Sequence, residues 1–225
     1  MKKLDRIRDL SYKRRQDRLE GFLNVSDFHD GRYDTHDFVS PYSKTACNLD
    51  ADVMLIGQDW SSEDRLNKGY SEVIAKLGYD PTIPTNKNLQ KLLKEFLNLD
   101  FGDCYATNLF VFIKKNGMSG SIPKKDFVYC ANKYTIEEIK IIKPKIVICM
   151  GSNAFKILSK IITGNEKTLK DYNDPIYDAN SGAHIVGVYH PGGQGTANAG
   201  GTEKVRERWA KIGEFYRTAD FDMRA

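Results

Sequence analysis

The sequence predicts an α/β fold, with a central, mostly parallel four-stranded sheet between two layers of helices. Four short runs rich in Val and Ile are typical of strands, and they cover residues 53–56, 104–112, 145–150 and 184–189. The runs lack clean polar alternation, so both faces of each strand should be covered. Helical patterns separate the runs, and such alternation favours a parallel sheet with helices on both faces.

The helical patterns lie between these strands and after the last one. Residues 88–97 place apolar side chains three and four positions apart, which gives one apolar stripe. A second helix is predicted over residues 125–142, and it ends before Pro144 because the residue preceding a proline disfavours helical geometry. Residues 154–162 and 203–216 complete the set.

The N-terminal fifty residues contain two segments of different character. Residues 1–20 are rich in Lys and Arg, which fits either a solvated helix with internal ion pairs or a surface facing phosphate. Residues 21–50 lack a periodic pattern, as do residues 163–183. The acidic and histidine side chains near residue 30 lack metal-ligand spacing, so we expect a polar loop that wraps the sheet. These side chains are Asp27, His29, Asp30, Asp34, His36 and Asp37.

Composition narrows the class of protein. A chain of 225 residues, with 40% apolar and 28% charged side chains, favours one globular domain over residues 1–225, with its core over residues 51–217. No apolar run reaches the roughly 20 residues that cross a bilayer, and the N-terminus lacks the apolar region of a secretory signal. We therefore expect an intracellular, cytoplasmic protein without a membrane partner, and a monomer by default.

The four cysteines are Cys47, Cys104, Cys130 and Cys149, and they form no C-x-x-C pair. Free thiols are the simplest interpretation in a reducing compartment, with Cys104 and Cys149 buried in strand-like runs. The spacing does not support a metal or iron–sulfur site. We expect no metal and no cofactor.

Small or polar residues follow each apolar run, and in the second run they follow Cys104–Ala106. In chain order they are GQDW at 57–60, TN at 107–108, GSNA at 151–154 and HPGGQG at 190–195. Ligands of parallel α/β sheets bind beyond the carboxyl ends of the strands. One site should therefore gather these four turns.

The order and context of these motifs resemble the uracil-DNA glycosylase superfamily over residues 50–217. VMLIGQDW is similar to its first motif, in the version of the main uracil-removing family. PTNKNLQKLLKEF resembles the proline-containing loop and following helix, and CYATNLF resembles the strand with the base-reading Asn. IKPKIVICMGSNAFK resembles the third strand and its continuation, and VYHPGGQG resembles the His-Pro motif that begins the minor-groove loop.

The resemblance implies a monofunctional DNA glycosylase with Asp59 and His190 as the catalytic pair. Cleavage of an N-glycosidic bond develops positive charge on the sugar and negative charge on the base. Asp59, as an anion, would stabilise the sugar and orient the attacking water. His190 would donate a hydrogen bond to the base carbonyl. Asn108 would read a uracil edge, since an amide offers one acceptor and one donor group.

The resemblance also implies the surroundings of the base and the contacts to DNA. The further substrate-binding residues are Gly57, Gln58, Trp60, Ser61 and Tyr70, with Tyr70 as the stacking aromatic and Trp60 as its alternative. Base flipping costs a few kcal/mol, which phosphate contacts must help offset. The expected DNA-binding residues are Ser152, Lys156, Pro191, Gly192, Gly193 and Gln194. Ser152 begins a helix and suits an anion, although a simple N-cap explains it equally well. Lys114 and Lys115 are expected to add charge toward DNA.

Several positions depart from the main uracil-removing family. Its first motif continues with Pro-Tyr, whose Tyr excludes a 5-methyl group, whereas Trp60 and Ser61 stand here. Ser61 would leave space beside C5 of the base unless Trp60 fills it. Gln194 stands where the family inserts a leucine into DNA. Cys130 resembles one ligand of an iron–sulfur subfamily, but Phe112 occupies another ligand position, so we expect no cluster.

Several functions therefore stay open. Within the glycosylases, the target is uracil or a related pyrimidine, or a bulky 5-modified base of foreign or phage DNA. A DNA-binding relative without catalysis is disfavoured by the presence of both Asp59 and His190. A protein that binds free nucleotides is disfavoured by the lack of a P-loop or G-x-G-x-x-G motif. The sequence leaves the strandedness of the DNA and the role, in repair or in defence, undetermined.

Overall fold

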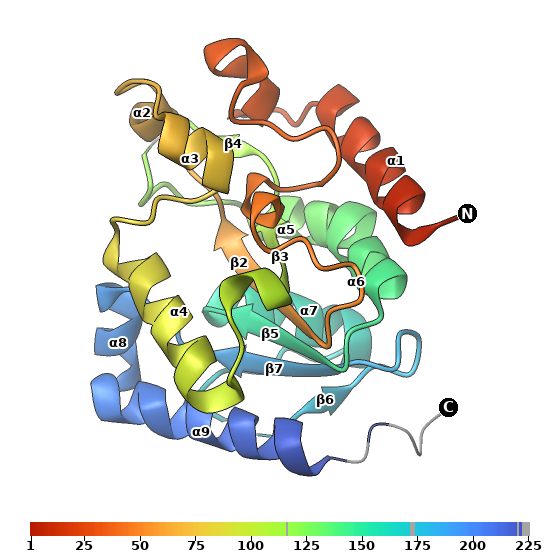
Figure 1. The fold of residues 1–225 in the computed structure, drawn as a ribbon, viewed down its shortest axis with the longest axis vertical. Helices are drawn as coiled ribbons and strands as arrows, with labels where there is room; N and C mark the ends of the chain where they lie inside the picture. Colours follow the sequence, from red (N-terminus) through yellow and green to blue (C-terminus); the bar gives the residue numbers. More distant parts are fainter. Residues whose placement is uncertain (116, 172–173, 220, 222–225) are drawn as a thin grey trace.

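The computed structural model describes residues 1–115, 117–171, 174–219 and 221. A sheet of order β3-β2-β5-β7-β6 lies at its centre, between two layers of helices (Figure 1). The predicted α/β fold is confirmed. The strands of this sheet are β2 (Val53–Asp59), β3 (Tyr105–Phe110), β5 (Ile146–Met150), β6 (Ile176–Tyr177) and β7 (His184–Val188).

Within the described residues, the sheet has five strands rather than the predicted four. The four predicted strands run parallel to their neighbours, and β6 pairs antiparallel with β7 at one edge. With only two residues, β6 is too short to leave a hydrophobic pattern. The predicted first strand ended at residue 56, whereas β2 continues to Asp59 because its pairing with β3 extends to Phe110.

One face of the sheet is covered by α4 (Pro84–Leu97) and α9 (Thr202–Thr218), as Figure 1 shows. The predicted leucine stripe of α4 packs there with Trp209 of α9, which is fully buried. Pro84 occupies the first turn of α4, where its missing N–H has no helical partner to lose. The helix ends at Asn98, whose left-handed backbone is typical of a C-terminal cap.

The other face is covered by α1 (Lys3–Gln16), α5 (Lys124–Cys130), α6 (Ile136–Ile142) and α7 (Ser152–Thr163). The helix predicted over residues 125–142 is interrupted by a π-helical turn at Ala131–Thr135. It ends at the left-handed Lys143, directly before Pro144, as the sequence predicts.

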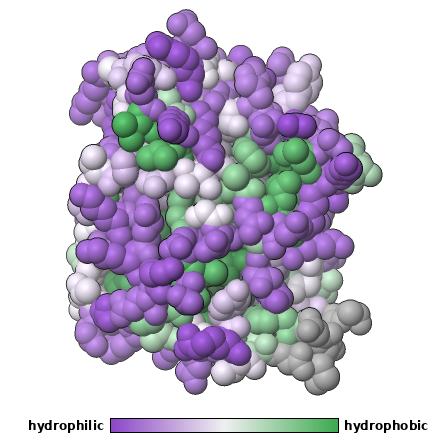
Figure 2. All heavy atoms as spheres, in the orientation of Figure 1, coloured by the Kyte–Doolittle hydropathy of each residue, from purple (hydrophilic) through white to green (hydrophobic). Residues whose placement is uncertain are grey.

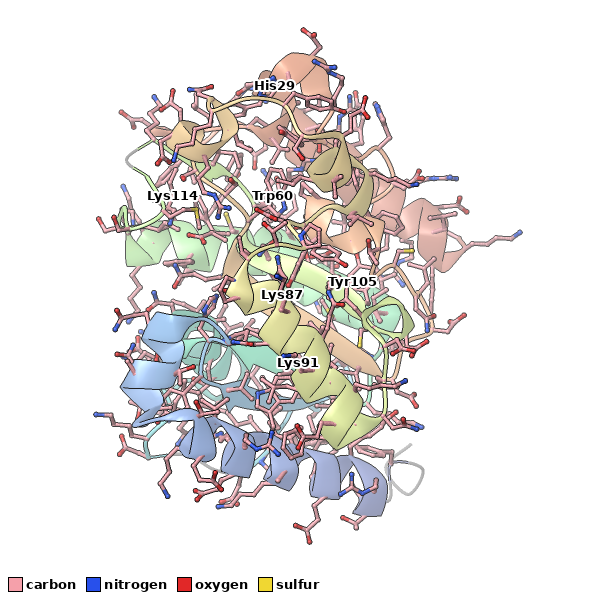
Figure 3. All side chains as sticks on the ribbon, turned by 60° about the vertical axis from the view of Figure 1, so that its left-hand side comes forward. His29, Trp60, Lys87, Lys91, Tyr105 and Lys114 are labelled. Atoms are coloured by element: carbon pink, nitrogen blue, oxygen red, sulfur yellow. The ribbon has the colours of Figure 1, made fainter. Side chains whose placement is uncertain are left out.

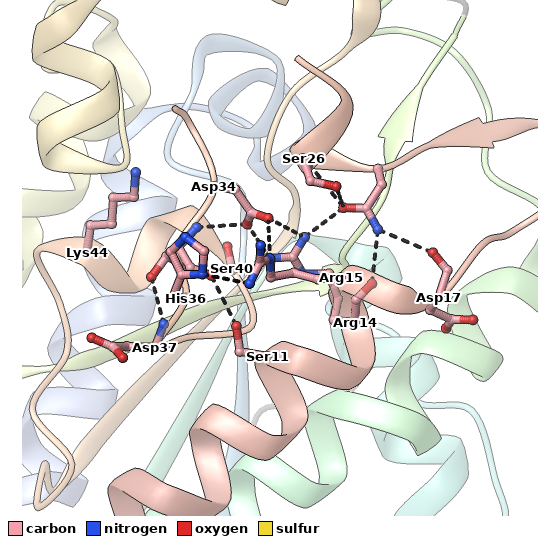
Figure 4. A network of polar contacts seen from close by, with 12 residues as sticks. Ser11, Arg14, Arg15, Asp17, Ser26, Asp34, His36, Asp37, Ser40 and Lys44 are labelled. Atoms are coloured by element: carbon pink, nitrogen blue, oxygen red, sulfur yellow. Dashed lines mark hydrogen bonds and ion pairs between the residues drawn. The ribbon is translucent and has the colours of Figure 1, made fainter. Parts of the chain in front are cut away.

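Residues 17–50 wrap over the carboxyl edge of the sheet as short turns and one short strand. The strand is β1 (Phe22–Leu23), which pairs with β4 (Ile113–Lys114), and the 3-10 turns are Val25–Asp27, His29–Gly31 and Pro41–Lys44. A polar network ties this segment to α1 (Figure 4). Arg14 is fully buried, forms an ion pair with Asp34 and donates to Asn24 Oδ1 at 2.8 Å.

These contacts bear on the two interpretations of the basic N-terminus. Arg14 points into the protein, and exposed Arg8 pairs with Asp37 at 2.7 Å. Lys13 pairs with Asp9 one helical turn away, at 2.6 Å. Much of the charge of α1 is therefore used within the fold.

Three short helices lie outside the predicted pattern: α2 (Glu63–Leu66), α3 (Glu72–Leu77) and α8 (Gly193–Ala199). Figure 1 shows α2 and α3 beside the wrapping segment, and α8 next to α4. Among the described residues, no helix has the length and apolar character needed to cross a membrane. Hydrophilic side chains dominate the face seen in Figure 2, where hydrophobic ones gather in small patches.

The cysteines are free thiols, and the burial predicted for Cys104 and Cys149 is confirmed. Cys130 is buried as well, and Cys47 is partly exposed. Within the described part of the chain, no group of three or more His, Cys, Asp or Glu side chains is placed to hold a metal ion.

Candidate functional site

A cavity of about 440 Å³ opens at the carboxyl ends of the parallel strands. Its lining includes Asp59 from the end of β2, Asn108 from β3, Met150 from the end of β5 and His190 just after β7. Three of the four expected turns contribute to this lining, whereas the GSNA turn at 151–154 does not, and β5 contributes Met150 instead. The catalytic and base-reading residues expected from the sequence share one cavity.

The carboxylate of Asp59 is held from one side. Its Oδ2 atom lies 2.7 Å from Lys114 Nζ and 3.4 Å from Gln58 Nε2. Gln58 is held in turn, because its Oε1 accepts a hydrogen bond from Asn153 Nδ2 at 2.8 Å. Only 8% of the Asp59 side chain is exposed. The carboxylate therefore has a fixed orientation, and within the described chain no hydrogen bond engages its Oδ1 atom.

His190 is held as a neutral imidazole whose proton is on Nε2. The backbone N–H of Gly192 donates to His190 Nδ1 at 3.1 Å, and an amide N–H cannot accept, so Nδ1 carries no proton. Burial lowers the pKa of His190 below its usual 6.5, although the charge of Asp59 opposes this shift. The residue is nevertheless accessible to solvent and lines the cavity. His190 can therefore donate from Nε2 without being charged.

Two glycines after His190 make this geometry possible. A Cβ on Gly195 would lie 2.0 Å from the carbonyl oxygen of His190, and a Cβ on Gly192 would lie 2.7 Å from Thr85 Oγ1. These contacts require both glycines for packing around His190, which adds a reason beyond the expected approach to phosphate. A Cβ on Gly193 meets no atom within 4 Å, so that position faces open space.

Asn108 lies on β3 opposite Gly57 of β2, and 3% of the residue is exposed. A Cβ on Gly57 would lie 2.7 Å from Asn108 Nδ2, so only glycine leaves room for the amide. The Asn108 Oδ1 atom accepts a hydrogen bond from the Ser40 hydroxyl at 2.6 Å. Ser40 was absent from the sequence prediction because no motif links residue 40 to residue 108.

Aromatic side chains form one wall of the cavity. Trp60 lines it and is fixed by a hydrogen bond from Nε1 to the Gly78 carbonyl at 2.7 Å. The remaining aromatic residues of the lining, which the sequence did not reveal, are Tyr33, Tyr42 and Tyr79. Tyr70 does not line the cavity; its ring packs against Tyr33 at 5.3 Å, under the guanidinium of Arg32. Of the two expected stacking aromatics, the structure brings only Trp60 to the cavity.

The residue after Trp60 shapes the part of the lining next to β2. Ser61 is buried and lines the cavity, as its place after the first motif suggested. Beyond it lie Arg65 and Asp80, whose side chains approach within 3.5 Å of one another and also line the cavity.

The expected DNA-binding residues differ in whether they line the cavity. Pro191 lines the cavity, and its carbonyl accepts from Asn88 Nδ2 at 3.0 Å. Gln194 is exposed in the first turn of α8, with a hydrogen bond to Asn198. Ser152 is exposed as the first residue of α7, and Gly151 rather than Ser152 is the N-cap. Lys156 lies one turn later, at a separate shallow pocket.

Lys114 departs from its expected role. Lys114 was expected, with Lys115, to add charge toward DNA, but only 2% of its side chain is exposed and its Nζ atom binds Asp59. Lys115, the next residue, is exposed. Figure 3 shows Lys114 near Trp60, above the end of α4 that carries Lys87. Because adjacent lysines in sequence give no sign of which one is buried, the ion pair had no sequence signal.

Comparisons with known proteins agree with this geometry. A search of curated proteins finds no match. A scan against protein families finds that the model of the Uracil DNA glycosylase superfamily matches residues 45–213. This match covers more than half of the chain and includes Asp59, Asn108 and His190. The chain therefore belongs to the uracil DNA glycosylase superfamily.

Proposed function

We propose that the protein is a monofunctional DNA glycosylase that hydrolyses the N-glycosidic bond of a flipped-out pyrimidine and leaves an abasic site. The observation that carries this proposal is the shared cavity of Asp59, His190 and Asn108. The cavity combines a fixed carboxylate with a neutral imidazole that donates from Nε2. These are the groups that separate a sugar cation from a base anion.

The chemistry follows from the charges at the bond that breaks. As the bond between C1′ and the base nitrogen breaks, its electron pair moves onto the base, and His190 Nε2–H donates a hydrogen bond to the base carbonyl that gains charge. Asp59 stabilises the positive charge at C1′ and orients the water that adds there. The water proton passes to the Asp59 carboxylate, and the departing base takes up a proton from solvent. The products are the free base and an abasic sugar.

Asn108 selects the base by its hydrogen-bonding edge. The Ser40 hydroxyl donates to Asn108 Oδ1, which leaves the NH₂ group to donate to a base carbonyl. A second lone pair on Oδ1 remains to accept from a base N–H. Uracil and its 5-substituted derivatives present this combination at O4 and N3–H.

A 5-substituted pyrimidine is the second candidate target, and the cavity itself favours it. Its volume of about 440 Å³ is in the range of pockets that hold drug-sized ligands. Ser61, the residue expected beside C5, has a small side chain. The lining continues to Arg65 and Asp80, whose charged groups suit hydrogen bonds with a polar substituent.

Mass spectrometry of the bases released from defined oligonucleotides tests both candidates. The probes contain uracil, mismatched thymine, 5-hydroxymethylcytosine or glucosylated 5-hydroxymethylcytosine, each in single-stranded and duplex DNA. We expect release of at least one base, with alkali-sensitive sites left in the DNA. Release of the glucosylated base without release of uracil would support a role against foreign modified DNA.

Substitution of the catalytic pair provides the matching control. Asp59→Asn keeps the shape of the side chain but removes its charge, and we expect the excision rate to fall by orders of magnitude while DNA binding persists. Excision that survives both Asp59→Asn and His190→Ala would show that the assigned mechanism is wrong. Absence of release from every probe, with DNA still bound, would favour a binding protein without catalysis.

A further inference from the structure

A buried ammonium group lies against the carboxylate of Asp59. Lys114 is the second residue of β4, and its backbone is paired on both sides, with Phe22 of β1 and in a bridge with Ser62. Ser62 lies three positions after Asp59, so the same stretch of chain carries the carboxylate and holds the backbone of the lysine. This double pairing fixes where the lysine side chain begins.

The far end of the side chain is fixed as well. Lys114 Nζ lies 2.7 Å from Asp59 Oδ2 and donates a second hydrogen bond to the carbonyl of Met118. The two side chains are 2% and 8% exposed, so water screens their attraction little. Lys114 does not belong to the lining of the base cavity. Its two hydrogen-bond partners, Asp59 and Met118, do line the cavity, so any effect of the lysine on the substrate passes through these partners.

The contacts distinguish the two oxygens of the carboxylate. Both Lys114 and Gln58 donate to Oδ2, whereas no hydrogen bond to Oδ1 is found in the described part of the chain. We propose that Lys114 is a positioning residue, which holds the Asp59 carboxylate turned so that Oδ1 receives the attacking water. This inference rests on the proposed glycosylase function. The ammonium group of Lys114 also balances part of the negative charge of Asp59. Asp59 is therefore better suited to orient the attacking water than to stabilise the sugar cation by charge alone.

An excision assay with matched lysine variants tests this inference. Lys114→Met keeps the length of the side chain but removes its charge. We expect the single-turnover rate of base release to fall about 100-fold, the loss expected from small misplacement of a reacting group. Affinity for an uncleavable oligonucleotide with a 2′-fluorinated target nucleotide should stay unchanged. Lys114→Arg, which retains the charge, should recover part of the lost rate.

Lys140→Met is the matched control. Lys140 lies the same 2.7 Å from a carboxylate, that of Glu137, but on the surface of α6, with 43% of its side chain exposed. Its removal should leave the rate unchanged, because an exposed ion pair contributes little. A comparison of the two rates therefore shows whether the loss is specific to the buried pair or follows from removal of any lysine–carboxylate pair.

Three results would overturn the inference. One is a folded Lys114→Met variant that releases base at the wild-type rate. Another is a loss of DNA affinity as large as the loss of rate. The third is a covalent protein–DNA adduct, trapped by borohydride, that forms with the wild type and not with Lys114→Met. Such an adduct requires the Lys114 amine to bond to C1′ as an imine with loss of water, which makes it a nucleophile instead of a positioning residue.

The double variant Asp59→Asn/Lys114→Met is the control for a loss of folding in Lys114→Met. A single buried charge without its partner is strongly destabilising, whereas removal of both is tolerated. If Lys114→Met alone does not fold, recovery of the melting temperature in the double variant supports the ion pair, and no recovery contradicts it. If the wild type releases no base from any probe, the proposed function fails, and the melting temperatures still test the pairing.

Discussion

At the scale of single residues, the proposed base selectivity depends on the orientation of the Asn108 amide. Ser40 donates to Asn108 Oδ1 at 2.6 Å and accepts from the Tyr42 backbone N–H at 3.2 Å. If the amide rotated by half a turn, the buried Ser40 hydroxyl would lose its acceptor, and a buried unsatisfied group costs about 1–3 kcal/mol. The orientation of the amide is therefore fixed. Under the proposed function, its NH₂ group would face O4 of a uracil-type base, where cytosine has an amino group.

We predict that Ser40→Ala weakens the discrimination between uracil-type and cytosine-type bases by about tenfold, which corresponds to about 1.4 kcal/mol. The ratio of single-turnover rates on two oligonucleotides with the same C5 substituent measures this effect. Ser43→Ala is the control, because it removes a buried hydroxyl of the same turn that bonds to the Ala106 carbonyl instead. An unchanged ratio in Ser40→Ala would mean that the hydroxyl does not orient the amide.

At the scale of elements, a buried carboxyl group joins α6 to β3. Glu138 of α6 is fully buried and accepts hydrogen bonds from Tyr105 at 2.7 Å and Thr107 at 3.0 Å. Burial raises the pKa of Glu138 to about 8, against the smaller opposing effect of the two hydrogen bonds. The folded state therefore keeps a proton that the unfolded chain releases near its ordinary value of 4.5.

The resulting prediction concerns the pH dependence of stability. The contribution of Glu138 is fully present below pH 4.5 and is lost as the pH rises toward about 8. Across that window the free energy of unfolding should fall by up to about 1.4 kcal/mol per pH unit. Glu138→Gln cannot titrate and should flatten this slope in urea unfolding measured at several pH values. Glu137→Gln is the control, because 38% of the Glu137 side chain is exposed and this variant should keep the wild-type slope. Equal slopes in Glu138→Gln and the wild type would contradict the prediction.

Elements differ in how well the sequence predicts them, and the reason is the range of the interactions that form them. The parallel strands and the long helices were predicted because each carries an apolar pattern of its own, as in α4. The strands β1, β4 and β6 have two residues each and exist through pairing with distant partners. The helices α2, α3 and α8 were missed because their few turns carry too few apolar positions.

At the scale of the whole molecule, the N-terminal segment and the core build the site together. The family match begins at residue 45, yet Tyr33 and Tyr42 line the cavity and Ser40 holds Asn108. This segment is tied to α1 through the buried pair of Arg14 and Asp34. The position of this segment over the strand ends therefore depends on its contacts with α1.

We predict that Arg14→Ala destabilises the protein by up to about 3–5 kcal/mol, because the buried Asp34 would lose its closer partner and keep only Arg15, at 3.5 Å. Base release should fall as well, since the segment that carries Ser40 loosens. Arg8→Ala removes an ion pair with Asp37 whose side chains are 51% and 47% exposed, and it should cost at most about 1 kcal/mol. Thermal melting and single-turnover excision of both variants check this, and equal effects would count against a structural role of the buried pair.

The residues of the candidate site that belong to a recognisable sequence motif were predictable. Asp59, Asn108 and His190 each follow or belong to a strand with a recognisable sequence, and they meet in the cavity. Ser40 and Lys114 lacked such a signal, because their roles arise from contacts with residues 68 and 55 positions away. Contacts of this range depend on the complete fold, so a single sequence does not reveal them.

The wrapping segment has a consequence for how the proposed activity diversifies. The strand ends carry the groups proposed to break the bond, whereas residues 33–42, before the start of the family match, supply two aromatic lining residues and the hydroxyl that binds Asn108. Substitutions in that segment alter the space and polarity around the base without moving the reacting atoms. Exchange of this segment between related chains is therefore a route to retarget excision by design, with the catalytic strands kept as a constant frame.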